Sequence, residues 1–163
     1  MPILIVLMLA APPLPLPPCR VARLQVSLDG RGGDFNGMSH SGTKLSIRNI
    51  GPDCMLVALP TIQLGDARNR IVPAVRQAPR GMHPGPVMVP VRLAAGHRAA
   101  AEIRWVSGPV FPHSRSVHAT RITVKIGTRT LTAALPATLY GAVGKPTTFE
   151  QTPLHAIEGV AAG

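Results

Sequence analysis

Aromatic residues are scarce in this sequence: they make up 3% of its 163 positions, although hydrophobic residues as a whole reach 45%. A buried core must therefore be built mainly from Val, Ile, Leu and Ala. Proline (18 residues) and glycine (16 residues) are by contrast abundant. Because both interrupt helices and mark turns, the composition favours many short strands. The length suits one domain with a normal core and a short N-terminal extension.

Acidic residues are also few, with seven in the whole chain. Four of them lie in segments that contain Gly or Pro, namely Asp29, Asp34, Asp53 and Asp66. In such segments Asp commonly accepts the hydrogen bonds of an Asx turn. Acid–base catalysis would need two carboxylates to converge, and nothing in the sequence requires this. The Gly-x-Ser-x-Gly motif of many hydrolases is absent as well. We therefore expect no enzymatic activity.

No apolar run is long enough to cross a bilayer. The longest N-terminal run, Ile3–Ala11, is far shorter than the ~20 residues that a spanning helix needs, so we expect no transmembrane span. It is typical of the apolar part of a secretory signal peptide, although no Lys or Arg precedes it; a plain apolar tail is the alternative. Leu14–Pro18 predicts a stiff, extended spacer. Residues 1–18 are thus assigned to a signal peptide and Pro-rich spacer.

The chain has two cysteines, Cys19 and Cys54. In an exported chain they can oxidise to a disulfide, and closing a loop of this length stabilises a fold by roughly 3–4 kcal/mol in the chain-entropy model. Two reduced, buried thiols are the alternative if the chain is not exported. Lipidation of Cys19 is disfavoured, because Pro17 and Pro18 precede it where small residues are expected.

The formal net charge of +10 is carried mostly by arginine. Such a balance fits an anionic partner, such as nucleic acid, anionic lipid or a polyanionic cell-wall polymer, or simply a solvated basic surface. The arginines are spread singly from Arg20 to Arg129, with no basic run. Nucleic-acid binders usually cluster their charge and add aromatics or Gly-rich loops. We therefore expect no nucleic-acid partner.

Alternation of apolar and polar residues is the main structural signal in the middle of the chain. It recurs over residues 22–28, 44–50, 87–93, 97–106, 121–126 and 129–135, as in strands with one buried face. Trp105 belongs to the apolar face of its segment and is expected in the core. Roughly seven to nine short strands with regular turn signals indicate an all-β fold, a single antiparallel β-sandwich over residues 19–146. Residues 147–163 are weakly patterned and are interpreted as a C-terminal tail.

Several short motifs recur in a known order along this chain. A cysteine opens the first strand, and then come a Gly-rich loop, a strand ending in Asn, a second cysteine in a turn, and a late hairpin. Here these are Cys19, Gly30–Gly42, Leu45–Asn49, Pro52–Cys54 and Leu93–Ala99. In this respect the segment from Cys19 to about Leu154 resembles exported bacterial proteins of domain-of-unknown-function family 4232.

The resemblance implies an immunoglobulin-like β-sandwich, export, and a disulfide from the first strand to the second turn. It implies no reaction. Many relatives have further cysteines near the last strands, whereas this chain has none there, so its C-terminal hairpin is expected to be held by packing alone.

Two loops contain methionine next to histidine: Met38 with His40, and Met82 with His83. Thioether and imidazole groups suit Cu(I), and methionine still serves as a ligand where thiols are oxidised. These four residues are therefore a candidate copper site if the loops converge. Loop methionines more often pack over the edge of a core, and loop histidines are often only solvated.

The loops Gly30–Gly42 and Arg76–Pro86 are long for hairpin connections, and long ordered loops often bind something. Their Gly-rich backbone, with Arg31, Arg80 and exposed histidines, would suit an anionic or sugar-like ligand. The sequence thus predicts an exported protein, periplasmic or secreted. It would act as a non-enzymatic binding or accessory module, with an anionic or cell-envelope ligand as the candidate partner. A periplasmic copper carrier is the alternative.

Overall fold

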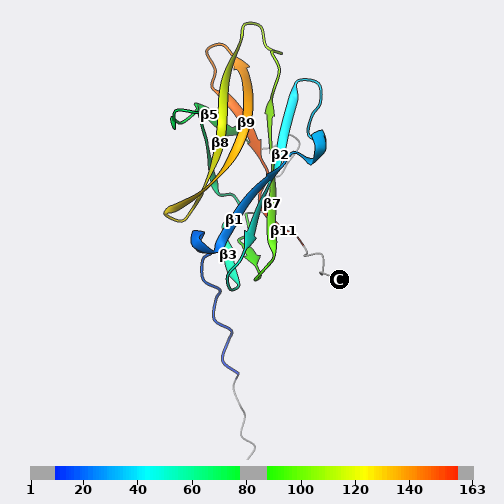
Figure 1. The fold of residues 1–163 in the computed structure, drawn as a ribbon. Helices are drawn as coiled ribbons and strands as arrows, with labels where there is room; N and C mark the ends of the chain where they lie inside the picture. The colour runs from blue at the N-terminus through cyan, green and yellow to red at the C-terminus, as the bar shows by residue number, and fades with distance from the viewer. Residues whose placement is uncertain (1–9, 78–87, 158–163) are drawn as a thin grey trace, which may run out of the picture.

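The computed structural model describes residues 10–77 and 88–157. The described part contains two short 3-10 turns, η1 (Val21–Arg23) and η2 (Arg31–Gly33), and otherwise only strands (Figure 1). In chain order these are β1 (Leu24–Asp29), β2 (His40–Asn49), β3 (Cys54–Leu56), β4 (Thr61–Gly65), β5 (Ala74–Gln77), β6 (Val91–Leu93), β7 (Arg98–Val106), β8 (Ser114–Ile126), β9 (Arg129–Ala142), β10 (Thr147–Gln151) and β11 (His155–Ile157). The expected all-β class is confirmed.

The strands form three sheets. A six-stranded sheet has the order β1-β2-β7-β10-β5, with β11 also paired to β7; β4-β8-β9 and β3-β6 form the other two. The prediction of one antiparallel sandwich of seven to nine strands is therefore corrected in two respects. The described residues form eleven strands, and β10 pairs with β5 in parallel. Three of the strands have only three residues each, and two of these, β3 and β11, lie outside the segments in which alternation recurs. The immunoglobulin-like topology stays a prediction.

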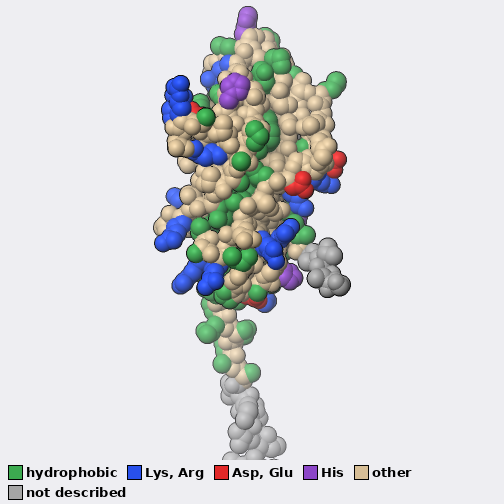
Figure 2. Space-filling view, viewed as in Figure 1, with side chains coloured by type: hydrophobic (Ala, Val, Ile, Leu, Met, Phe, Trp, Pro, Cys, Tyr) green, Lys and Arg blue, Asp and Glu red, His purple; other side chains and the backbone are tan. Residues whose placement is uncertain are grey.

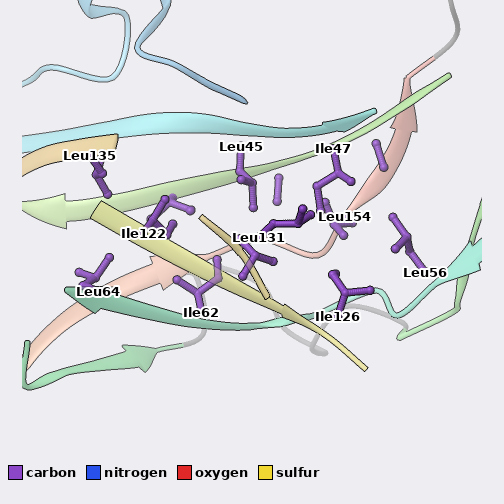
Figure 3. Packing of buried hydrophobic residues seen from close by; sticks show 14 of the residues in the cluster. Leu45, Ile47, Leu56, Ile62, Leu64, Ile122, Ile126, Leu131, Leu135 and Leu154 are labelled. Atoms are coloured by element: carbon purple, nitrogen blue, oxygen red, sulfur yellow. The ribbon is translucent and has the colours of Figure 1, made fainter. Parts of the chain in front are cut away.

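The core lies between the six-stranded sheet and the β4-β8-β9 sheet. Leu45 and Ile47 point from β2 toward Ile122 and Leu131 of the facing sheet (Figure 3). Along β2 the buried side chains alternate with outward-facing ones, as the pattern of the sequence predicts. Trp105 is 7% exposed and belongs to the same apolar cluster, which confirms its expected place in the core.

The β8–β9 hairpin is longer than the alternation indicates. Its turn lies at Gly127, which has a φ of +60°, as expected for a tight turn. The sequence divides the second arm at Pro136, yet β9 continues through this proline. The register shifts between Ala119 and Arg121, next to the pairs Ala119–Ala137 and Arg121–Ala134. Pro136 thus falls at a bulge, where its missing N–H costs no ladder hydrogen bond.

The segment predicted to be a C-terminal tail, residues 147–163, contains β10 and β11. Both belong to the six-stranded sheet, where β10 lies between β7 and β5. The inward side chains of β10 are Thr147, Phe149 and Gln151. Two of these three are polar, which is why apolar alternation does not reveal this strand. The domain therefore extends past residue 146.

Candidate functional site

Two of the four candidate copper ligands lie at the entry to β2: Met38 in the turn before it and His40 as its first residue. The side chain of Met38 is 96% exposed, and Nδ1 of His40 lies 3.0 Å from the carbonyl oxygen of Met38. Met82 and His83 lie outside the described residues. Within residues 10–77 and 88–157 no three His, Cys, Asp or Glu side chains gather as metal ligands would. The copper site stays a prediction.

A hollow of about 290 Å³ lies next to His40 at the end of the six-stranded sheet. Its lining comes from the loop before β2 and from strands β2, β5, β7 and β10, namely Phe35, His40, Gln77, Arg104, Trp105, Val106, Thr148, Phe149 and Glu150. The register places Gly42 opposite Arg104, Glu150 opposite Arg104 on the other side, and Gln77 beside Glu150. Directly paired residues face the same side of a sheet, so these four form one row across the outer face.

The ring of Phe35 lies against the Arg104 side chain of this row. The guanidinium carbon of Arg104 lies 5.4 Å from the centroid of the Phe35 ring, and that of Arg31 lies 5.9 Å from it. Both distances are within the range of cation–π attraction. Phe35 is only 8% exposed. The ring therefore acts as a support that holds the Arg104 guanidinium at the rim of the hollow.

Gly42 provides the space that this arrangement needs. A Cβ atom at this position would lie 2.6 Å from the carbonyl oxygen of Ile103 and 3.1 Å from Cβ of Phe35. Any larger residue would force the loop away from the sheet. The glycine thus permits Phe35 to lie directly on the backbone of β2 and β7.

One end of the Arg104 side chain is also fixed by a carboxylate. Its Nη2 donates to Oε2 of Glu102 over 2.9 Å. A guanidinium has five N–H donors, so donors remain for a ligand in the hollow. With the imidazole of His40 on the same rim, the site presents hydrogen-bond donors next to apolar surface, which suits an anionic or hydroxyl-rich ligand.

Of the two loops predicted to bind a ligand, the first contributes Phe35 and His40 to this hollow. Of the second, only Arg76 and Gln77 are described; both lie in β5, and Gln77 lines the hollow, whereas Arg80 lies outside the described residues. Neither Phe35 nor Arg104 is identified in the sequence analysis. An aromatic side chain inside a Gly-rich loop, in a chain so poor in aromatics, is the signal that marks Phe35.

The aspartates in turns act as acceptors, as the sequence predicts. Asp29 accepts from the backbone N–H of Arg31 over 2.8 Å. Asp66 accepts from the N–H groups of Arg68 and Arg70 and pairs with the Arg70 guanidinium at 2.8 Å. The N–H of Arg70, more than its guanidinium, holds the pKa of the Asp66 carboxyl below its ordinary value.

Asp53 differs because its partners lie far along the chain. It accepts from the N–H of Ala95 over 2.9 Å and from the guanidinium of Arg92 over 3.1 Å. The hydrogen bond from the Ala95 N–H lowers the pKa of this carboxyl most, and the hydrogen bond from Arg92 lowers it next. Asp53 therefore joins the turn before β3 to the segment between β6 and β7.

The predicted disulfide between Cys19 and Cys54 is present and joins residues 35 apart in sequence. Both cysteines are buried. Among the described residues no helix has the length and apolar character to cross a membrane.

Comparison with known proteins gives one match. A family model described as "Domain of unknown function (DUF4232)" covers residues 19–155. No curated protein and no solved structure matches the chain.

Proposed function

The chain belongs to the DUF4232 family of domains of unknown function, and from this premise we propose that it is an exported, non-enzymatic binding module that works in the periplasm or is secreted. The Cys19–Cys54 disulfide supports export, because such bonds persist in oxidising compartments and are rare in the cytosol. A binding role, as opposed to catalysis, is supported by the aspartates described above, which serve as turn acceptors and ion-pair partners.

The observation that carries the binding role is the hollow beside Arg104. Its rim combines guanidinium and imidazole donors with the apolar surface of Val106. Surface of this kind binds ligands that have both acceptor groups and an apolar ring face. We therefore assign to the hollow an anionic or sugar-like ligand, of the kind that cell-envelope polymers offer.

A titration followed by amide NMR tests this proposal. The probe is a soluble amino-sugar disaccharide that carries a carboxylate, with the uncharged disaccharide beside it. We expect shifts of the amides of Gly42, Arg104 and Thr148. Replacing Arg104 with Gln should weaken binding of the charged probe by about tenfold or more, since hydrogen bonds to charged groups contribute about 1.5–3 kcal/mol.

Arg76→Gln is the matched control, because it removes the same charge from an exposed position on β5 that does not line the hollow. It should bind the probe as the unaltered protein does. Equal loss of affinity in the two variants, or shifts confined to other faces, would contradict the assignment.

A further inference from the structure

Two arginines face each other directly on the outer side of the six-stranded sheet. Arg48 of β2 is paired in register with Arg98 of β7, and Gln25 of β1 lies on the other side of Arg48. Like charges in directly opposed positions destabilise a sheet. No ion pair within the described part of the chain includes either guanidinium. The folded state is therefore destabilised locally by repulsion between the two guanidiniums, and a bound anion would relieve this repulsion.

The surface around this pair is hollowed. A depression of about 500 Å³ is lined by Gln25, Val26, Ser27, Arg48, Arg98 and Thr132. Besides the two guanidiniums, the lining offers hydroxyl and amide donors. Paired guanidiniums with neutral donors between them match the oxygen atoms of a phosphate group.

Two more arginines lie at the same end of the sandwich. The carbonyl oxygen of Arg23 accepts from the N–H of Ile50, just after Arg48 on the chain, and the N–H of Arg23 donates to Arg20. The stem of Arg23 crosses Gly51, where an added Cβ would lie 2.8 Å from Cβ of Arg23. We call Arg20, Arg23, Arg48 and Arg98 the basic end. The carboxylate that follows this turn, Asp53, is already paired with Arg92.

Figure 2 shows where basic side chains lack acidic neighbours on this face of the molecule. Blue groups lie over its lower half, most with no red group beside them, whereas the blue groups at the upper left and at the right have red neighbours. The four arginines of the basic end are all exposed. Their charge is therefore available to a partner.

Apolar side chains accompany the basic end. Ile50, in the turn beside Arg23, is 47% exposed, and Leu14 is 90% exposed. Leu14 belongs to the extended stretch that leaves the sandwich at this end (Figure 1). That stretch is tied to β3 by the hydrogen bonds between Met55 and the backbone of Pro17 and Cys19. Cations beside protruding aliphatic side chains are typical of surfaces that rest on lipid headgroups.

We propose that the basic end docks on a bilayer surface that contains anionic phospholipids, with a headgroup phosphate between Arg48 and Arg98. The aliphatic neighbours distinguish this partner from nucleic acid, for which aromatic stacking surfaces would be expected. Docked in this way, the molecule directs the Arg104 hollow, at the other end of β7, away from the membrane.

Vesicle co-sedimentation of the full chain at low salt tests the docking. Vesicles of phosphatidylcholine with phosphatidylglycerol are compared with vesicles of phosphatidylcholine alone, which report any binding by the apolar N-terminal run. We expect binding to the anionic vesicles that is lost in high salt. The double variant Arg48→Gln, Arg98→Gln should lower the partition coefficient about thirtyfold, the equivalent of about 1 kcal/mol per basic residue.

The charge-matched control is Arg68→Gln with Arg76→Gln, two exposed arginines outside the basic end. It should bind the vesicles far more strongly than the first double variant. Equal losses in the two double variants would overturn the proposal, as would the absence of binding to anionic vesicles. Binding of soluble polyphosphate without binding of vesicles would also overturn it. The Arg104→Gln variant should bind vesicles as the unaltered protein does. The vesicle result therefore tests the docking separately from the ligand proposed for the Arg104 hollow.

Discussion

At the scale of single residues, Asn49 joins three parts of the chain at the disulfide end. Its Nδ2 donates to the carbonyl oxygens of Pro52 and Leu93 over 2.8 and 3.0 Å, and its Oδ1 accepts from the N–H of Gly51 over 2.8 Å. The residue is 1% exposed. The sequence marks Asn49 as a motif residue, yet Leu93 lies 44 positions away, so no local pattern reveals this contact.

We predict that Asn49→Ala lowers the free energy of unfolding by about 3 kcal/mol or more, because it leaves buried backbone groups without partners, each at a cost of about 1–3 kcal/mol. Denaturant unfolding followed by circular dichroism measures the change. Asn36→Ala is the control, since the hydrogen bond of Asn36 to Ser41 is exposed; it should cost well under 1 kcal/mol. A comparable loss in both variants would contradict the role assigned to Asn49.

At the scale of the elements, what the sequence reveals depends on how apolar each buried face is. The buried face of β7 is apolar, and alternation predicts this strand well; for β8 it reveals only the part from residue 121 onward. Alternation does not predict β10, because its inward Gln151 is polar. The Nε2 of this residue donates to the carbonyl oxygen of Pro60, 91 residues away. Its parallel pairing with β5 depends equally on distant partners.

We predict that a chain ending at residue 146 does not fold, whereas a chain ending at residue 157 does. The shorter chain loses Phe149 and Leu154 from the core and leaves β5 without the strand it pairs with. Loss of a buried Phe side chain alone costs about 3–5 kcal/mol. Thermal unfolding and size-exclusion chromatography distinguish the outcomes. A cooperative transition in the shorter chain would restore the boundary at residue 146 that the sequence indicates.

At the scale of the whole molecule, the ends of the sandwich differ. The hollow beside Arg104 lies at one end of β7, and the basic end lies at the other, where the disulfide joins the entry of the chain to β3. The sequence predicts the cysteine pair, which the structure confirms. It does not predict the Arg48–Arg98 opposition, since this depends on the β2–β7 register, or the contact of Phe35 with Arg104, since this depends on how the loop folds onto the sheet.

The central claim is that the protein works outside the cytosol with Cys19 and Cys54 joined. Its most direct test is the intact mass of the protein recovered from its producing cells, denatured and alkylated without a reductant. We predict a chain shortened at its N-terminus and carrying no alkyl group, because the disulfide protects both thiols. In the chain-entropy model this bond stabilises the fold by about 4 kcal/mol. A full-length chain with both cysteines alkylated would contradict the account.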